Sequence, residues 1–216
     1  ILNIRGNSGV YFNGIPHMGD PYNSGYMHIP VNLKKGLNEL FVRGTNISAD
    51  LIFPGKAVSL ASDDLTLPSV IKGNDNSNLE AAIVIINTSS KTLSSLQLKT
   101  SMGGKEIKST LPPVPPMTTR KVKFRFDASG ITEKGWNDCS VSLFEKQKLI
   151  DTSTIKIECV EPGDKYSVTF TSNIDGSLQY YAVTPQLPAA KDSGNALFLS
   201  VHGAGVEALG QARAYQ

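Results

Sequence analysis

The sequence has few of the features that mark membrane, disulfide-rich or nucleic-acid-binding proteins. Its 216 residues include two cysteines and 7% aromatic residues. No apolar run approaches the roughly 18 residues that a membrane-spanning helix needs. Lys+Arg number 21 and Asp+Glu 19, so the formal net charge of +2 does not favour nucleic acid as a partner. With 40% hydrophobic and 19% charged residues, the composition is that of a globular protein without a membrane span.

The two cysteines, Cys139 and Cys159, indicate no metal site. They lie in no C-x-x-C pattern and have no histidine near them in sequence. Each shares the apolar face of its own expected strand, so both are predicted to face the core. Whether they form a disulfide stays open at this point, because the register of the two strands is not given by the sequence.

Turn-forming residues divide most of the chain into short strands. The 19 Gly and 12 Pro, together with Asn and Asp, interrupt apolar or alternating runs every ~8–12 residues, which is typical of β-sandwiches. Polar, turn-rich residues around 62–68 mark a boundary near residue 68. We therefore expect a mainly β protein with two β-sandwich modules over residues 1–68 and 69–162, followed by a different unit over residues 163–216.

Several local patterns predict particular features of these modules. Asn13-Gly14 is suited to the positive φ angles of a tight hairpin turn. The clearest strand is 121–126, where apolar residues alternate with Lys and Arg, so that one face is apolar and the other is in water. Trp136, the single tryptophan, is expected to fill the core of the second module.

The C-terminal region contains the pattern with the clearest chemical meaning. Residues 196–201 are almost continuously apolar, which predicts a strand buried on both faces in a parallel sheet. Residues 206–215 have the composition of a helix. Between them lie His202, Gly203, Ala204 and Gly205, and the two glycines would let backbone N–H groups approach an acyl oxygen closely. A strand, this turn and a helix form the context of an oxyanion loop in α/β-hydrolases.

Two stretches resemble known families. Residues 170–215, about a fifth of the chain, resemble the opening of the catalytic domain in secreted α/β-hydrolases related to the prolyl oligopeptidase family. Residues 10–14 and 31–40, with their V-x-x-N-G and L-K-K-G-x-N patterns, resemble galactose-binding-like jelly rolls attached to bacterial hydrolases. The resemblance implies a jelly roll incomplete at its N-terminus, an Ig-like β-sandwich and a truncated α/β-hydrolase opening, in a secreted or periplasmic bacterial protein.

The resemblance further implies a serine peptidase or esterase that acts on a peptide or ester without a cofactor. Its nucleophile would lie on a G-x-S-x-G turn, and no such pattern occurs in this sequence. Because the triad follows the oxyanion loop in chain order, it would lie beyond Gln216. We therefore expect the chain to be an excised, catalytically silent segment. The resemblance then transfers only the oxyanion loop of residues 202–205, with no general-base role for His202.

The alternative from a different class is a non-catalytic module that binds carbohydrate or a partner protein. His17, Tyr22 and Tyr26 lie in one turn-rich segment and could line a glycan site through aromatic and polar contacts. Ordinary loop composition is the favoured interpretation of this segment. A pure spacer role for the sandwiches is a third alternative.

Carboxylates also cluster in the expected linkers. Asp63 and Asp64 form one group, and residues 74–76 form another. Hard oxygen ligands suit Ca²⁺, but neither group has the full ligand spacing. We interpret both as linker and expect no metal.

Overall fold

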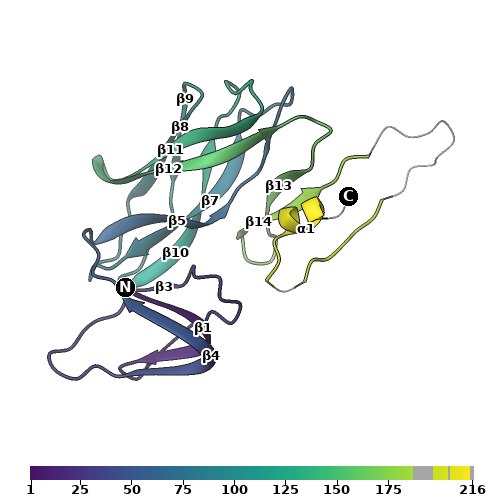
Figure 1. Ribbon diagram of the computed structural model, residues 1–216. Coiled ribbons are helices and arrows are strands. Elements are labelled where there is room, and N and C mark those ends of the chain that lie inside the picture. The colour runs from purple at the N-terminus through teal and green to yellow at the C-terminus, as the bar shows by residue number, and fades with distance from the viewer. Residues whose placement is uncertain (187–196, 204, 215–216) are drawn as a thin grey trace.

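The computed structural model describes residues 1–186, 197–203 and 205–214, and strands make up most of them. Figure 1 shows a sheet at the N-terminus, a β-sandwich above it, and a C-terminal hairpin with a short helix to one side. The mainly β fold with sandwich-type sheets is therefore confirmed. An α/β-hydrolase portion is not present among the described residues.

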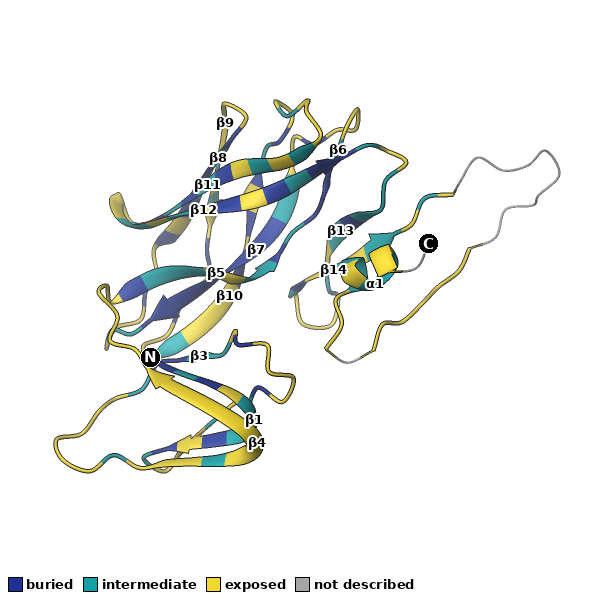
Figure 2. Ribbon diagram, viewed as in Figure 1, coloured by how far each residue is buried: buried dark blue, intermediate teal, exposed yellow. Residues whose placement is uncertain are grey.

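The N-terminal sheet has four strands: β1 (Leu2–Phe12), β2 (Ile15–His17), β3 (His28–Ile29) and β4 (Leu40–Leu51). β1 is central, with β2 and β3 on one edge and β4 on the other. Asn13 and Gly14, both with positive φ, form the predicted turn between β1 and β2. Figure 2 shows β4 exposed along most of its length. Residues 1–51 thus form one sheet, and the facing sheet of the implied jelly roll is not present among the described residues.

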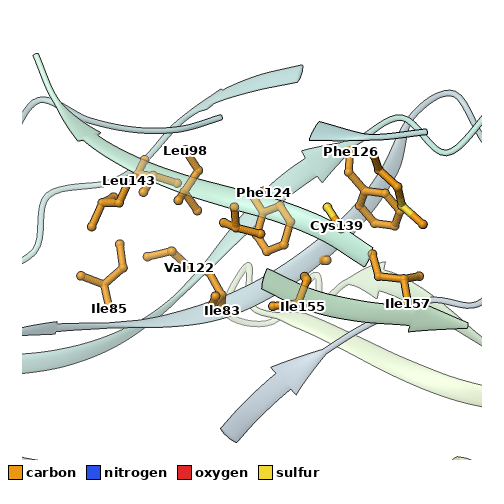
Figure 3. Packing of buried hydrophobic residues seen from close by; sticks show 14 of the residues in the cluster. Ile83, Ile85, Leu98, Val122, Phe124, Phe126, Cys139, Leu143, Ile155 and Ile157 are labelled. Atoms are coloured by element: carbon orange, nitrogen blue, oxygen red, sulfur yellow. The ribbon is translucent and has the colours of Figure 1, made fainter. Parts of the chain in front are cut away.

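The sandwich consists of a three-stranded sheet in the order β10-β7-β5 and a five-stranded sheet in the order β6-β12-β11-β8-β9. Its strands are β5 (Val58–Thr66), β6 (Val70–Ile71), β7 (Leu79–Asn87), β8 (Leu96–Met102), β9 (Lys105–Thr110), β10 (Thr118–Phe126), β11 (Gly135–Glu145) and β12 (Lys148–Val160). Figure 3 shows the core between the sheets. On β10, Val122, Phe124 and Phe126 are buried and the intervening cations are exposed, which confirms the predicted alternation.

β5 joins the sandwich rather than the N-terminal sheet. Residues 58–61 pair antiparallel with β7, and the ladder resumes at Thr66 after an irregularity. The polar residues Ser62, Asp63 and Asp64, which the sequence places in a linker, therefore lie within a strand of the sandwich. Hydrogen bonding assigns β5 to the second unit, although the expected boundary near residue 68 leaves it in the first. The division into 1–68, 69–162 and 163–216 itself stays a prediction.

The N-terminal sheet is held to the sandwich by polar contacts at β3. His28 Nε2 lies 2.5 Å from Asp63 Oδ2 on β5. Thr119 Oγ1 on β10 donates to the carbonyl oxygen of His28 at 2.5 Å. Next to them, Lys121 on β10 pairs with Asp64 at 2.7 Å. Asp63, one of the two aspartates expected in a linker, thus forms part of the contact between the two units, whereas Asp64 pairs within the sandwich.

We expect His28→Ala to loosen this contact without unfolding the sandwich. The variant loses the hydrogen bond to Asp63, and such a partly exposed hydrogen bond contributes about 1 kcal/mol. The loss shifts the equilibrium between the docked N-terminal sheet and a state in which this sheet has separated from the sandwich. Limited proteolysis should therefore cleave the chain between residues 30 and 58 about fivefold faster. His17→Ala, on β2, serves as the matched control and should leave the cleavage rate unchanged. Equal rates for the two variants would contradict this role of His28.

The two cysteines are buried and free, as their expected core-facing positions suggest. In the β11–β12 ladder, Cys139 pairs with Ile155 and Cys159 pairs with Gly135. The thiols are therefore offset by four positions along neighbouring strands, or roughly 13 Å at strand rise. This exceeds the Cα separation that a disulfide tolerates. The structure thus resolves the pairing that the sequence left open.

Burial raises the pKa of the Cys139 thiol to about 11, against a smaller opposing effect of the Ser101 backbone. The native thiol should therefore resist disulfide-exchange reagents at pH 8 and react readily once the chain is unfolded. Because folding raises the pKa of this thiol, the thiol's contribution to the free energy of unfolding is fully present below the ordinary thiol pKa. That contribution declines as the pH rises toward the pKa of the folded state. The melting temperature should therefore decline between pH 7 and pH 11, and it should decline less in Cys139→Ala. Rapid native labelling at pH 8 would contradict this prediction.

The C-terminal part contains β13 (Tyr166–Thr171), β14 (Leu178–Val183) and α1 (Ala208–Ala214). β13 and β14 form a two-stranded hairpin. Ser167 N–H donates to Ser69 Oγ at 3.1 Å, and Ser69 N–H donates to the carbonyl oxygen of Ser167 at 2.9 Å. These bonds attach the hairpin to the segment before β6. The helix expected near residues 206–215 is confirmed as α1.

The buried strand expected over residues 196–201 is wrong for the residues that the structure describes. Residues 197–201 form no strand. The side chains of Leu197, Phe198, Leu199 and Val201 are about 90% exposed. A strand needs a neighbour to bond with and layers to cover its faces, and no described strand pairs with this segment.

Candidate functional site

A cleft of about 190 Å³ lies between the sandwich and the C-terminal part. Aromatic, acidic and aliphatic side chains line it: Leu65, Trp136, Glu158, Tyr180, Glu207 and Leu209. They come from β5, β11, β12, β14, α1 (Ala208–Ala214) and, in the case of Glu207, the position just before α1. We call this site the Trp136 cleft. It combines apolar walls with a few polar groups, which is the usual make-up of a ligand site.

Strand pairing positions one side of the cleft. Trp136 lies directly opposite Glu158 in the β11–β12 ladder, so the two side chains project from the same face of the sheet. The Trp136 side chain is 63% exposed. The expectation that Trp136 fills the core is therefore wrong. Cys139, an odd number of positions further on, faces the core, and alternation turns Trp136 toward the outside.

The other side of the cleft is built from the hairpin and the helix. Tyr180 Oη accepts a hydrogen bond from the backbone N–H of Ala208 at 3.2 Å, which ties β14 to α1. The hydroxyl proton of Tyr180 is left available for another acceptor. Burial raises the pKa of Tyr180, and the negative charge of Glu207 adds to the rise. Tyr180 therefore stays a neutral donor at physiological pH.

The loop between β2 and β3 reaches the same region. Gly205 lies against the ring of Tyr22, because a Cβ atom at Gly205 would be 3.6 Å from Tyr22 Cδ1. Tyr26 lies near enough to Tyr180 to influence its pKa. Two sites predicted from the sequence thus meet beside the Trp136 cleft. One is the loop that carries Tyr22 and Tyr26, which we call the aromatic loop. The other is the turn that contains Gly203 and Gly205, which we call the glycine turn.

Asp20 shapes this aromatic loop from within. Its carboxylate accepts the backbone N–H and hydroxyl of Ser24 at 3.0 and 2.7 Å, and the N–H of Gly25 at 2.7 Å. Burial alone would raise the pKa of Asp20, but these hydrogen bonds and the charge of Arg5 outweigh it and lower the pKa. The buried, ionised carboxylate therefore fixes the backbone that carries Tyr22 and Tyr26.

The remaining predicted residues are placed as follows. His17 is half-buried on β2 opposite Val10, and burial lowers its pKa. It does not line the Trp136 cleft. His202 and Gly203 are exposed, with His202 Nδ1 3.0 Å from the carbonyl oxygen of Gly203. Ala204 lies outside the described residues. The oxyanion role of residues 202–205 therefore stays a prediction.

The described residues contain no group of three or more His, Cys, Asp or Glu side chains that could hold a metal ion. Asp75, from one of the two acidic groups weighed as Ca²⁺ ligands, instead accepts the N–H and hydroxyl of Ser77 within a local turn. In the part of the chain that is described, no helix is both long and apolar enough to cross a bilayer.

Comparisons with known proteins find no matching family and no similar curated protein. Solved structures are similar only remotely. The CARDB domain of a Pyrococcus furiosus protein, solved with di-metal ions, is 14% identical with a TM-score of 0.32, covering 48% of this chain and 86% of that one. β-Glucuronidase 2 of Bacteroides uniformis is 11% identical with a TM-score of 0.39, covering 84% and 26%. A glycosyl hydrolase family 2 member from Bacteroides cellulosilyticus is 13% identical with a TM-score of 0.35, covering 82% and 27%.

This chain thus spans about a quarter of the length of those two glycosidases. At TM-scores below 0.5, none of the three similarities carries an argument about activity. The geometry of the site itself has to support any function.

Proposed function

We propose that this chain is a non-catalytic β-sandwich module that binds carbohydrate at the Trp136 cleft and the neighbouring aromatic loop. The observation that carries the proposal is the exposed Trp136, paired on its sheet face with Glu158 and lining the same cleft as Tyr180. An exposed tryptophan offers a flat apolar face to the C–H side of a pyranose ring, and carboxylates and hydroxyls beside it can bond the ring hydroxyls.

A glycan array with the full chain tests this proposal. We expect retention of a defined group of saccharides, lost in Trp136→Ala and weakened in Tyr22→Ala. Phe41→Ala is the matched control, because Phe41 is an equally exposed aromatic residue on β4. An array on which the wild-type chain retains no saccharide would reject the function.

A second candidate function is the accessory region of a secreted or periplasmic serine peptidase or esterase. The exposed apolar residues 197–201 favour it, because such a segment would be stabilised by burial in a larger sheet. They lead into His202 and the glycine turn, and α1 follows. The catalytic triad would have to come from residues outside this sequence.

Labelling of the full-length native protein with a serine-directed fluorophosphonate tests the second candidate. We expect covalent labelling that a denatured sample does not show. Cell fractionation would test the secreted or periplasmic location in the same preparation. Absence of labelling in the native, folded protein would reject the hydrolase candidate and leave the binding proposal intact.

A further inference from the structure

The charges around the Trp136 cleft do not balance. Glu158 forms an ion pair with Arg213 of α1. Glu207, an exposed residue that immediately precedes α1 and lines the cleft, has no ion-pair partner among the described residues. The cleft therefore offers one uncompensated carboxylate beside its aromatic walls. Water hydrates this exposed carboxylate in the free chain, and a cationic group bound in the cleft would pair with it directly, which a neutral ligand cannot do.

The aromatic walls favour the same kind of group. Trp136 and Tyr180 both line the cleft, and aromatic faces attract organic cations through their quadrupoles, tryptophan most strongly. Tyr180 also has a hydroxyl proton free to donate, because its oxygen already accepts from Ala208. The cleft thus presents a cation-binding carboxylate, a stacking face and one hydrogen-bond donor.

The size of the cleft limits what it can enclose. Its volume of about 190 Å³ is below the roughly 300–1,000 Å³ of pockets that take drug-sized molecules. It can enclose one ring with its substituents rather than an extended chain. Any further units of a polymer would lie outside, toward Tyr22 and Tyr26 of the aromatic loop.

We propose that the Trp136 cleft binds a single sugar unit that bears a free ammonium group, with the pyranose ring stacked on Trp136 and the ammonium beside the Glu207 carboxylate. This inference rests on the proposed carbohydrate function and names its ligand class. It makes Glu207 the residue that distinguishes an amino sugar from its neutral counterparts.

Isothermal titration of the full chain tests the ligand class directly. Three β-1,4-linked disaccharides of similar shape are compared at a pH where the amine is protonated: the glucosamine disaccharide, its N-acetylated form and cellobiose. We expect the free amine to bind roughly tenfold more tightly than the other two. Lysine amide supplies an ammonium without a sugar ring and should bind at least tenfold more weakly than the amino disaccharide.

Variants assign the effect to residues. Glu207→Gln should remove the preference for the free amine while retaining the binding of cellobiose. Trp136→Ala should weaken all three disaccharides, and Trp136→Phe should restore part of the affinity. Glu106→Gln is the matched control, because Glu106 is an exposed glutamate on β9 outside the cleft. Circular dichroism melting verifies that each variant is folded.

The outcomes separate the inference from the function on which it rests. Equal affinity for the three disaccharides would overturn the ammonium specificity and leave the carbohydrate function standing. Binding of none of them, together with an empty glycan array, would overturn both. Lysine amide that binds as tightly as the amino disaccharide would overturn the assignment to a saccharide and indicate a peptide ammonium group instead.

Discussion

Phe124→Ala is expected to destabilise the sandwich by about 3–5 kcal/mol, the usual loss for a buried phenylalanine. Phe124 lies on β10, is 1% exposed and sits in the core between the two sheets (Figure 3). Removal of its ring leaves a cavity that well-packed neighbours fill only in part. Urea denaturation followed by circular dichroism would measure the free energy of unfolding.

Phe41→Ala is the matched control for this measurement. Phe41 is also on a strand, but it is 63% exposed on β4. The same deletion there should change the free energy of unfolding by less than about 0.5 kcal/mol. Similar losses in both variants would contradict the assignment of the core to the space between the two sheets of the sandwich.

Asp20→Ala is expected to disorder the aromatic loop and to destabilise the chain by about 2 kcal/mol or more. The substitution leaves the buried N–H of Gly25 and the partly buried N–H of Ser24 without their acceptor, and an unsatisfied buried donor costs about 1–3 kcal/mol. Tyr22 would lose its fixed position against Gly205. Thermal melting and amide hydrogen exchange at residues 20–26 would measure the two effects.

The effect of Asp20 should depend on pH in a defined direction. Because folding lowers the pKa of this carboxyl group, its contribution is present above the ordinary Asp pKa and is lost as pH falls through the lowered value. The difference in melting temperature between wild type and Asp20→Ala should therefore be larger at pH 6 than at pH 2. A difference that grows on acidification would contradict this account.

Asp175→Ala is the matched control for Asp20. Asp175 accepts the N–H and hydroxyl of Ser177 in a similar local pattern, at 3.0 and 2.7 Å, but in an exposed turn. Water can replace the lost acceptor there, so the change in stability should stay below about 0.5 kcal/mol. An equal loss in both variants would show that burial does not distinguish the two carboxylates.

Features that depend on near neighbours in sequence were predictable. Alternation along β10 assigned its buried and exposed faces, and the Asn13-Gly14 pair located a hairpin turn. The helix near the C-terminus followed from composition alone. Each of these rests on a period or a turn preference within a few residues, which the surrounding fold did not override.

Trp136 shows where a general preference misleads. Its size and apolar character favoured the core, yet the same alternation that buries Cys139 turns Trp136 outward. The register of its own strand was therefore the better signal, and it was present in the sequence. Glu158, Tyr180 and Glu207 carried no comparable signal, because nothing local indicates that they share a cleft with Trp136.

By itself, then, the sequence determined the strand-rich class of the fold, the buried face of β10 and the core-facing cysteines. Those features follow from side-chain periodicity and from turn chemistry. Only the tertiary structure decided that β5 joins the sandwich, that residues 197–201 lie exposed, and that Tyr22 meets Gly205 beside the Trp136 cleft. The reason is physical: each of these features depends on whether segments far apart in the chain come together. How whole sheets dock decides this, and no local preference does.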